Sequence, residues 1–106
     1  MMSMLVTTTN SIDGKIINRY LGVVRGIVVR SPTIAQGIMG GLKAIVGGKI
    51  GAYTEMCESS REEAYQLMIQ HAQGLGANAI ICMRYDATDI GQAGTEVLCY
   101  GTAVII

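Results

Sequence analysis

Two hydrophobic patterns alternate along the chain and predict four strands and two helices. Short β-branched runs bounded by glycine, asparagine or aspartate predict strands at residues 5–9, 15–30, 78–89 and 95–106. Apolar positions at helical spacing predict helices at residues 33–46 and 54–75. We therefore expect a single domain, residues 1–106, of the α+β class, in the order strand, strand, helix, helix, strand, strand.

Turn-forming residues indicate how these strands are joined. Residues 10–14 (NSIDG) predict a hairpin between the first two strands, and residues 90–94 (IGQAG) predict another between the last two. We expect an antiparallel sheet with both helices packed on it. Gly22 and Gly26 interrupt the second strand, which favours one long bent strand over two strands meeting at a bulge.

The last hairpin carries apolar side chains on both of its faces. If its turn is centred on residues 92–93, Cys99 lies opposite Asp86, and Cys82 and Arg84 share the face of Cys99. Neither face is simply polar, as a half-solvated antiparallel sheet would require. One face therefore needs cover from protein that so short a chain does not supply, and we expect self-association.

Both expected helices have an apolar stripe. Beside the stripe of the first helix run Gly37, Gly41 and Ala44. Because glycine costs about 1 kcal/mol relative to alanine inside a helix, this small-residue face indicates close packing, either on the chain's own sheet or against another subunit. The expected buried stripe of the second helix consists of Cys57, Ala64, Met68, Ala72 and Leu75.

Composition narrows the class of protein. Half of the 106 residues are hydrophobic and 15% are charged, which argues for a folded domain. Eight basic residues balance eight acidic ones without a basic cluster, so nucleic-acid binding is not expected. No apolar run approaches the roughly 20 residues of a membrane helix, so no membrane span is expected. Three widely spaced cysteines without a CxxC pair favour the reducing cytoplasm.

The glycine-rich segment at residues 47–53 (GGKIGAY) is similar to a phosphate-binding loop in composition. A Walker-type loop needs a glycine where this chain has Lys43 and a hydroxyl residue where it has Ile50. The segment therefore lacks two required groups. Lys49 stays a candidate anion ligand, beside the alternative of a loop that needs glycine only for its backbone geometry.

Cysteine and histidine are the usual ligands of transition metals, which makes Cys82, Cys99 and His71 the candidate metal ligands. Cys57 and His71 lie about 21 Å apart along one helix, too far to share an ion. In the expected register Cys82 and Cys99 are separated by about 13 Å. A divalent metal would thus need ligands joined by the tertiary fold or from different subunits, and the alternative is that the cysteines are structural.

Arg84 and Asp86 project from one strand face, two residues apart. They could bind a small anion or metal ion, or else form an ion pair or a hydrogen bond between subunits. No Ser, His and Asp arrangement is visible, and the lone histidine has nothing near it in sequence to orient it. The sequence therefore predicts a protein that is not an enzyme, and the alternative is an enzyme with a site at a subunit interface around Arg84 and Asp86.

Four segments resemble the YbjQ-like family of small bacterial and archaeal proteins. They are residues 6–9 (VTTT), 45–53 (IVGGKIGAY), 75–81 (LGANAII) and 100–104 (YGTAV). Members of that family are described as candidate heavy-metal-binding proteins, and their biochemical role is not established. The resemblance implies an α+β subunit in a ring-shaped homopentamer.

Two functions are thus expected. The first is a non-enzymatic cytoplasmic homo-oligomer, a pentamer by the resemblance, that binds a metal or small ligand. The second is a heavy-metal sequestration or sensing protein whose cysteine ligands meet at subunit interfaces. Binding of a metal ion by cysteine thiolates would distinguish the heavy-metal protein from the general ligand-binding oligomer.

Overall fold

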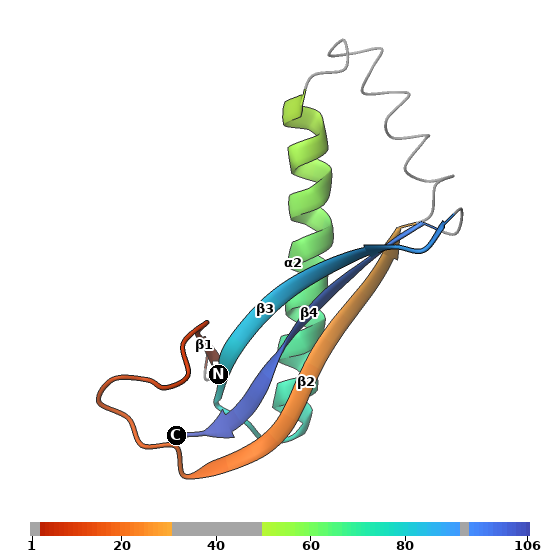
Figure 1. The fold of residues 1–106 in the computed structure, drawn as a ribbon. Helices are drawn as coiled ribbons and strands as arrows, with labels where there is room; N and C mark the ends of the chain where they lie inside the picture. The colour runs from red at the N-terminus through yellow and green to blue at the C-terminus, as the bar shows by residue number, and fades with distance from the viewer. Residues whose placement is uncertain (1–2, 31–49, 92–93) are drawn as a thin grey trace.

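The computed structural model describes residues 3–30, 50–91 and 94–106. Within these ranges the chain forms one helix and one sheet, as the α+β class requires (Figure 1). The four strands are arranged in the order β1-β3-β4-β2, and α2 lies against one face of the sheet. The elements are β1 (Leu5–Val6), β2 (Arg19–Arg30), α2 (Ile50–Gly74), β3 (Ala79–Asp89) and β4 (Thr95–Ile105).

The sheet is mixed, so the expectation of an antiparallel sheet is wrong. β1 runs parallel to β3, with Leu5 beside Ala79, and β2 lies at the opposite edge of the sheet. The segment after β1 does not turn back into a hairpin, because its main chain bonds to β3: the Thr7 N–H donates to Ile80 O at 2.9 Å. The expected hairpin between the first two strands is therefore also wrong. β2 itself is one long strand, with a register shift between Tyr20 and Gly22.

The helix expected at residues 33–46, with Gly37, Gly41 and Ala44, lies outside the described residues, as does Lys49. The second expected helix is α2, which begins at Ile50 instead of residue 54. The Ser60 hydroxyl donates to Met56 O, one turn back, at 3.2 Å. Ser60 thus lies inside the helix and does not begin it.

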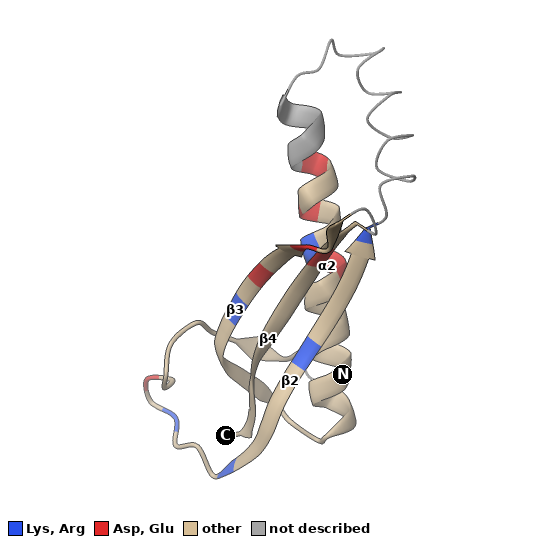
Figure 2. Cartoon of the chain, turned by 45° about the vertical axis from the view of Figure 1, so that its right-hand side comes forward, with Lys and Arg blue, Asp and Glu red and all other residues tan. Residues whose placement is uncertain are grey.

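The core forms where α2 packs on β2 and β4. Its members, all buried, are Val24, Val28, Ala64, Met68, Ala72, Ile80, Cys99 and Ala103. The expected helix stripe is confirmed at its three central positions, but Cys57 and Leu75 are exposed. The N-terminal part of α2, which contains Cys57, extends past the ends of the strands (Figures 1 and 2).

Gly26 sets how closely α2 approaches the sheet. A Cβ atom there would lie 2.6 Å from the backbone nitrogen of Met68, 2.8 Å from the Cβ of Leu67 and closer still to the carbonyl oxygen of Ala64. Atoms of the helix backbone cannot yield as the end of a flexible side chain can. Glycine is therefore the residue that lets helix and strand touch at this point.

A bulge in β3 decides which side chains share a face. The pairing of β3 with β4 shifts between Ile81 and Arg84, and Cys82 adopts a left-handed backbone with φ 56°. Beyond the bulge Cys99 pairs with Tyr85, not with Asp86. The expected register is therefore wrong by one residue, and Arg84 and Asp86 lie on the sheet face opposite Cys99.

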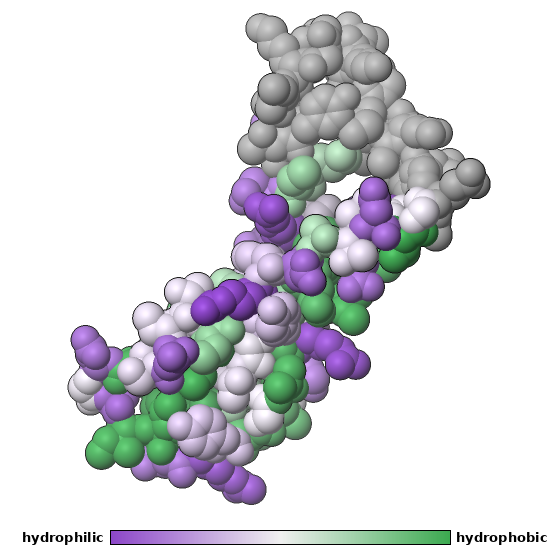
Figure 3. All heavy atoms as spheres, in the orientation of Figure 1, coloured by the Kyte–Doolittle hydropathy of each residue, from purple (hydrophilic) through white to green (hydrophobic). Residues whose placement is uncertain are grey.

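The sheet face opposite α2 is rich in exposed apolar side chains. On β2 these are Val23, Ile27 and Val29, with exposed fractions of 69%, 44% and 52%. On β4, Tyr100 is 36% exposed, and it pairs with Arg25. The space-filling view shows hydrophobic and hydrophilic residues interspersed over the sheet (Figure 3).

Candidate functional site

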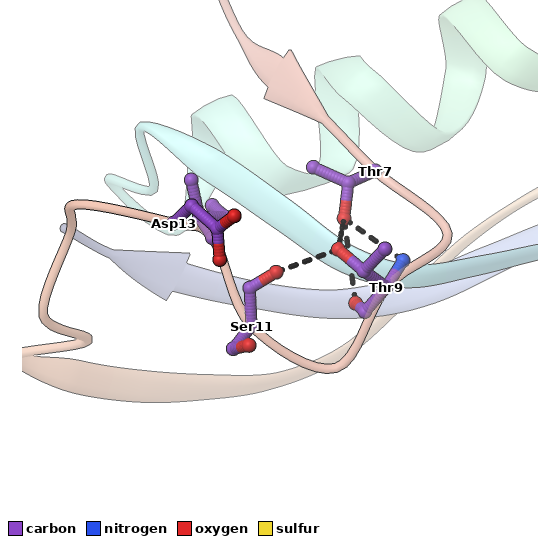
Figure 4. A pocket seen from close by; sticks show the side chains of 5 residues that line it. Thr7, Thr9, Ser11 and Asp13 are labelled. Carbon is purple, nitrogen blue, oxygen red and sulfur yellow. Dashed lines mark hydrogen bonds between the residues drawn. The ribbon is translucent and has the colours of Figure 1, made fainter.

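An open surface pocket lies in the loop that follows β1. Its volume is about 320 Å³, and it is lined by Thr7, Thr9, Ser11, Ile12 and Asp13 (Figure 4). The Thr7 and Thr9 hydroxyls are 2.7 Å apart, and the Thr9 hydroxyl donates to Ser11 O at 2.6 Å. The lining therefore presents a chain of hydroxyl groups beside one carboxylate.

The bulge in β3 holds this loop in place. The Cys82 N–H donates to Thr9 O and the Met83 N–H donates to Thr7 O, each at 3.0 Å. The Cys82 thiol donates to Asn10 Oδ1 at 3.3 Å. A cysteine with positive φ is unusual, and the bonds to the loop give a local reason for it.

Arg84 and Asp86 bind main-chain atoms. Arg84 Nη1 donates to Thr8 O at 3.0 Å and to Met83 O at 2.8 Å, which fixes the guanidinium next to the loop. Asp86 Oδ1 accepts from the Ala87 N–H at 2.9 Å. Within the described ranges, one salt bridge is present, between Arg30 and Glu63. Arg84 and Asp86 therefore do not pair with each other there, and both lie on the sheet face opposite α2.

The three candidate metal ligands lie in three different places. Cys82 lies at the bulge beside the loop, and Cys99 lies in the core beneath α2. His71 Nδ1 accepts a hydrogen bond from the Arg25 N–H at 3.2 Å, which occupies the lone pair of that nitrogen. In the described ranges no three His, Cys, Asp or Glu side chains come together at one point.

Cys99 contacts the sulfur atom of Met68 in the core. Its thiol contacts the thioether sulfur of Met68 at 3.7 Å, and both side chains are fully buried. Burial raises the pKa of the Cys99 thiol to about 11, and a hydrogen bond with Tyr85 offsets part of that shift. The thiol is therefore protonated at neutral pH.

Sequence reasoning did not single out the loop hydroxyls or Met68 as functional residues. The strand predicted at residues 5–9 includes Thr7 and Thr9, whereas in the structure these two residues follow β1 and line the pocket. Met68 was placed correctly in the buried stripe, but its contact with Cys99 depends on how α2 crosses β4. The signal available was the cluster of hydroxyl residues ahead of Asp13 and Gly14.

These features define a small α+β protein with one mixed sheet, a helix on one face and a hydroxyl-lined loop after the first strand. A family model described as "Putative heavy-metal-binding" matches residues 4–106. The chain belongs to this family, the YbjQ-like family.

Relatives of this chain are similar over nearly their whole length. An uncharacterised UPF0145 protein of Legionella pneumophila (strain Philadelphia 1) is 76% identical, covering 99% of this chain and all of the relative. A UPF0145 protein of Francisella philomiragia is 53% identical, covering 97% of this chain and 99% of the relative. These relatives carry no stated activity.

A solved structure shares the fold. It is a protein of unknown function of the DUF74 family from Pediococcus pentosaceus, with a TM-score of 0.59, 20% identity and 97% of each chain covered.

The described part of the chain contains no helix that is both long enough and apolar enough to cross a membrane.

Proposed function

We propose that the protein is a non-enzymatic cytoplasmic homo-oligomer that binds a small ligand or metal ion. The observation that carries the assembly is the exposed apolar face of β2, formed by Val23, Ile27 and Val29. Val23, Ile27 and Val29 lie on one face of the strand, with Arg25 between Val23 and Ile27, and exposed apolar side chains gathered on one face mark a surface that another protein covers. The three free cysteines suit a reducing compartment.

The strand that carries this patch is also an edge of the described sheet. Arg19 and Arg25 lie on β2, whereas Asp86 and Asp89 lie on β3, two strands away (Figure 2). A basic edge on one copy can therefore meet acidic groups of the next. Contacts between different surfaces of identical subunits close into a ring when the rotation between neighbours divides a full turn, and the family resemblance supports five subunits.

Sedimentation velocity and native mass spectrometry test the assembly. We expect one species of five chains at micromolar concentration. Ile27→Lys should shift it to smaller species, because a charge would enter the covered patch. Gln66→Lys, on the exposed side of α2, is the matched control and should leave the mass unchanged. A stable monomer of the unchanged protein would refute the proposal.

The polar loop is the proposed ligand site of this oligomer. The Thr7 and Thr9 hydroxyls and the nearby Arg84 can bind a small anion through directed hydrogen bonds, whereas the Asp13 carboxylate can only accept a hydrogen bond from a donor group of the ligand. Asp86 and Lys49 stay proposed contributors. Phosphate titration followed by amide NMR should shift the signals of the loop, and Arg84→Met should weaken the response. Unchanged loop signals at millimolar phosphate would exclude an anion site.

The second proposed function is binding of a heavy metal by cysteines of different subunits. The observation that favours it is that two thiols lie outside the core beneath α2: Cys57 is exposed, and Cys82 is half-buried against the cluster of Ala79, Ile81 and Val104. Zinc, cadmium and copper titrations of the reduced protein test this function. Equal binding by a variant in which Cys57, Cys82 and Cys99 are all serine would exclude thiolate ligation.

A further inference from the structure

The two threonine hydroxyls of the pocket after β1 already donate their protons inside the loop. Thr9 Oγ1 donates to Ser11 O at 2.6 Å, which uses its single proton. In the 2.7 Å contact between the two hydroxyls, Thr7 is therefore the donor, and Thr7 Oγ1 in turn accepts from the Thr9 N–H at 3.0 Å (Figure 4). Because a hydroxyl oxygen has two lone pairs, each of these oxygens has one left to accept a hydrogen bond.

The carboxylate of the pocket strengthens this preference for donors. Asp13 lines the pocket, and the salt bridge of the described ranges does not involve it. A carboxylate offers only lone pairs, whereas the Ser11 hydroxyl can either donate or accept. The lining in this arrangement therefore accepts hydrogen bonds and attracts positive charge. A primary ammonium group, with three N–H donors and a compact charge, matches it.

A positive side chain lies against the same loop. Arg84 Nη1 donates to the carbonyl oxygen of Thr8, the residue between the two pocket threonines, and to Met83 O. These two bonds use the two hydrogens of Nη1, and the donors of Nε and Nη2 are the ones that the proposed anion can occupy. The loop thus has a negative group in its pocket and a positive group beside it.

From this pairing we propose that the loop binds a small zwitterion. Its ammonium group binds Asp13 and the oxygens of Thr7 and Thr9, and its anionic group binds Arg84. The inference rests on the proposed anion site at Arg84 and names the class of ligand. The pocket volume of about 320 Å³ is at the lower end of the range for small-molecule sites, so the ligand has few heavy atoms. Ile12 gives the carbon chain between the two charges an apolar wall.

A zwitterion fits the loop better than a simple anion does. An anion in the pocket would meet the like charge of Asp13, and it could receive a proton from Thr7 or Thr9 only by breaking a hydrogen bond within the loop. An ammonium group uses the remaining lone pairs and leaves both bonds intact. The ligand therefore carries its positive charge on the Asp13 side and its negative charge on the Arg84 side.

Amide NMR titrations with three probes test the ligand class. The probes are phosphoethanolamine, which carries a phosphate and a primary ammonium group, inorganic phosphate, and ethylammonium chloride. All are titrated at pH 7 and equal ionic strength, and the signals of residues 7–13 are followed. We expect phosphoethanolamine to bind roughly tenfold more tightly than either single-charge probe, because it forms charged hydrogen bonds at both ends.

Asp13→Asn separates a zwitterion from a simple anion by the sign of its effect. The affinity for phosphoethanolamine should fall roughly tenfold, because the ammonium group loses its charged partner. The affinity for phosphate should stay equal or rise, because a like charge is removed. Glu62→Gln on α2 is the matched control: it removes one negative charge from an exposed carboxylate bonded to Gln66, and it should change neither affinity.

The outcomes distinguish this inference from the proposed anion site. If Asp13→Asn leaves the affinity for phosphoethanolamine unchanged or raises it, the ammonium group does not bind in the pocket and the inference is wrong. Phosphate binding that Arg84→Met weakens would still support the anion site in that case. If neither phosphate nor phosphoethanolamine shifts the loop signals at millimolar concentration, the anion site and the inference both fail.

Discussion

His71 Nδ1 accepts a hydrogen bond from the main-chain N–H of Arg25 across 3.2 Å. Arg25 lies on β2, an edge of the described sheet, and its N–H points away from β4 toward the helix. The last turn of α2 thus satisfies one open donor of the sheet edge.

Replacing His71 should weaken the fold modestly. We expect His71→Ala to lower the free energy of unfolding by about 1 kcal/mol, the usual net contribution of one such hydrogen bond. His71→Asn should recover part of the loss, since the asparagine side-chain oxygen can accept at a similar position. Urea unfolding at pH 7 measures both. If Gln70→Ala, an exposed neighbour on α2, has the same effect as His71→Ala, the hydrogen bond contributes nothing.

Gly26 supports a second prediction, about the contact between helix and strand. Gly26→Ala should destabilise the protein by about 3 kcal/mol, because its Cβ would overlap the backbone of α2 at Ala64 and Met68. Gly74→Ala is the control, since a Cβ at Gly74 meets nothing within 4 Å. Chemical unfolding of both variants gives the comparison. Equal stabilities would show that α2 does not approach β2 this closely in solution.

The sequence was sufficient for the elements whose signals are local. The strands β2, β3 and β4 follow runs of β-branched residues, and the centre of α2 follows its apolar stripe at Ala64, Met68 and Ala72. These predictions succeeded because the periodicity of each segment is a property of that segment alone. They required no knowledge of what lies beside it.

The pairing of strands was not predictable in the same way. β1 has two residues, too few for a pattern, and its parallel partner β3 lies more than 70 residues along the chain. The bulge at Cys82 has no local signal, because cysteine is not a residue that favours positive φ. A shift of one residue there moves every later side chain to the other face, which is why Arg84 was wrongly placed beside Cys99.

Arg30 links the end of β2 to α2 by two hydrogen bonds that should contribute unequally to stability. Its Nε donates to the buried Ser60 hydroxyl at 2.9 Å, and its Nη2 pairs with the Glu63 carboxylate at 2.6 Å. Ser60→Ala should lower stability by about 1 kcal/mol, since it leaves a donor of Arg30 without its partner. Glu63→Ala should cost about 0.5 kcal/mol or less, because that side chain is 51% exposed.

Double-mutant cycles with Arg30→Ala measure the two couplings separately. The coupling of Arg30 with Glu63 should shrink in 0.5 M salt, whereas the coupling with Ser60 should not. Gln66→Ala serves as a reference for an exposed site on the same helix. A larger coupling for Glu63 than for Ser60 would contradict the assignment.

The buried Cys99 thiol should make stability fall in alkaline solution. Burial raises its pKa from an ordinary value of 9.0 to about 11, so the folded chain holds the thiol proton more tightly than the unfolded chain does. The stabilisation is fully present below pH 9 and is lost as the pH rises through about 11. Its size is on the order of 3 kcal/mol, from the shift in pKa.

Urea unfolding between pH 8 and pH 11 measures this loss of stability. The free energy of unfolding of the Cys57→Ser/Cys82→Ser variant is compared with that of the same variant carrying Cys99→Ala. Cys99→Ala lowers stability at every pH because it removes buried sulfur, but its curve should be flatter between pH 9 and pH 11. Tyr65 and Tyr85 titrate in both proteins, and the part of their raised pKa values that comes from burial cancels in the difference, whereas the part that comes from Cys99 is lost with Cys99→Ala. Parallel curves would mean that the thiolate forms in the folded protein as readily as in the unfolded chain, and that Cys99 is not enclosed by the contact with Met68.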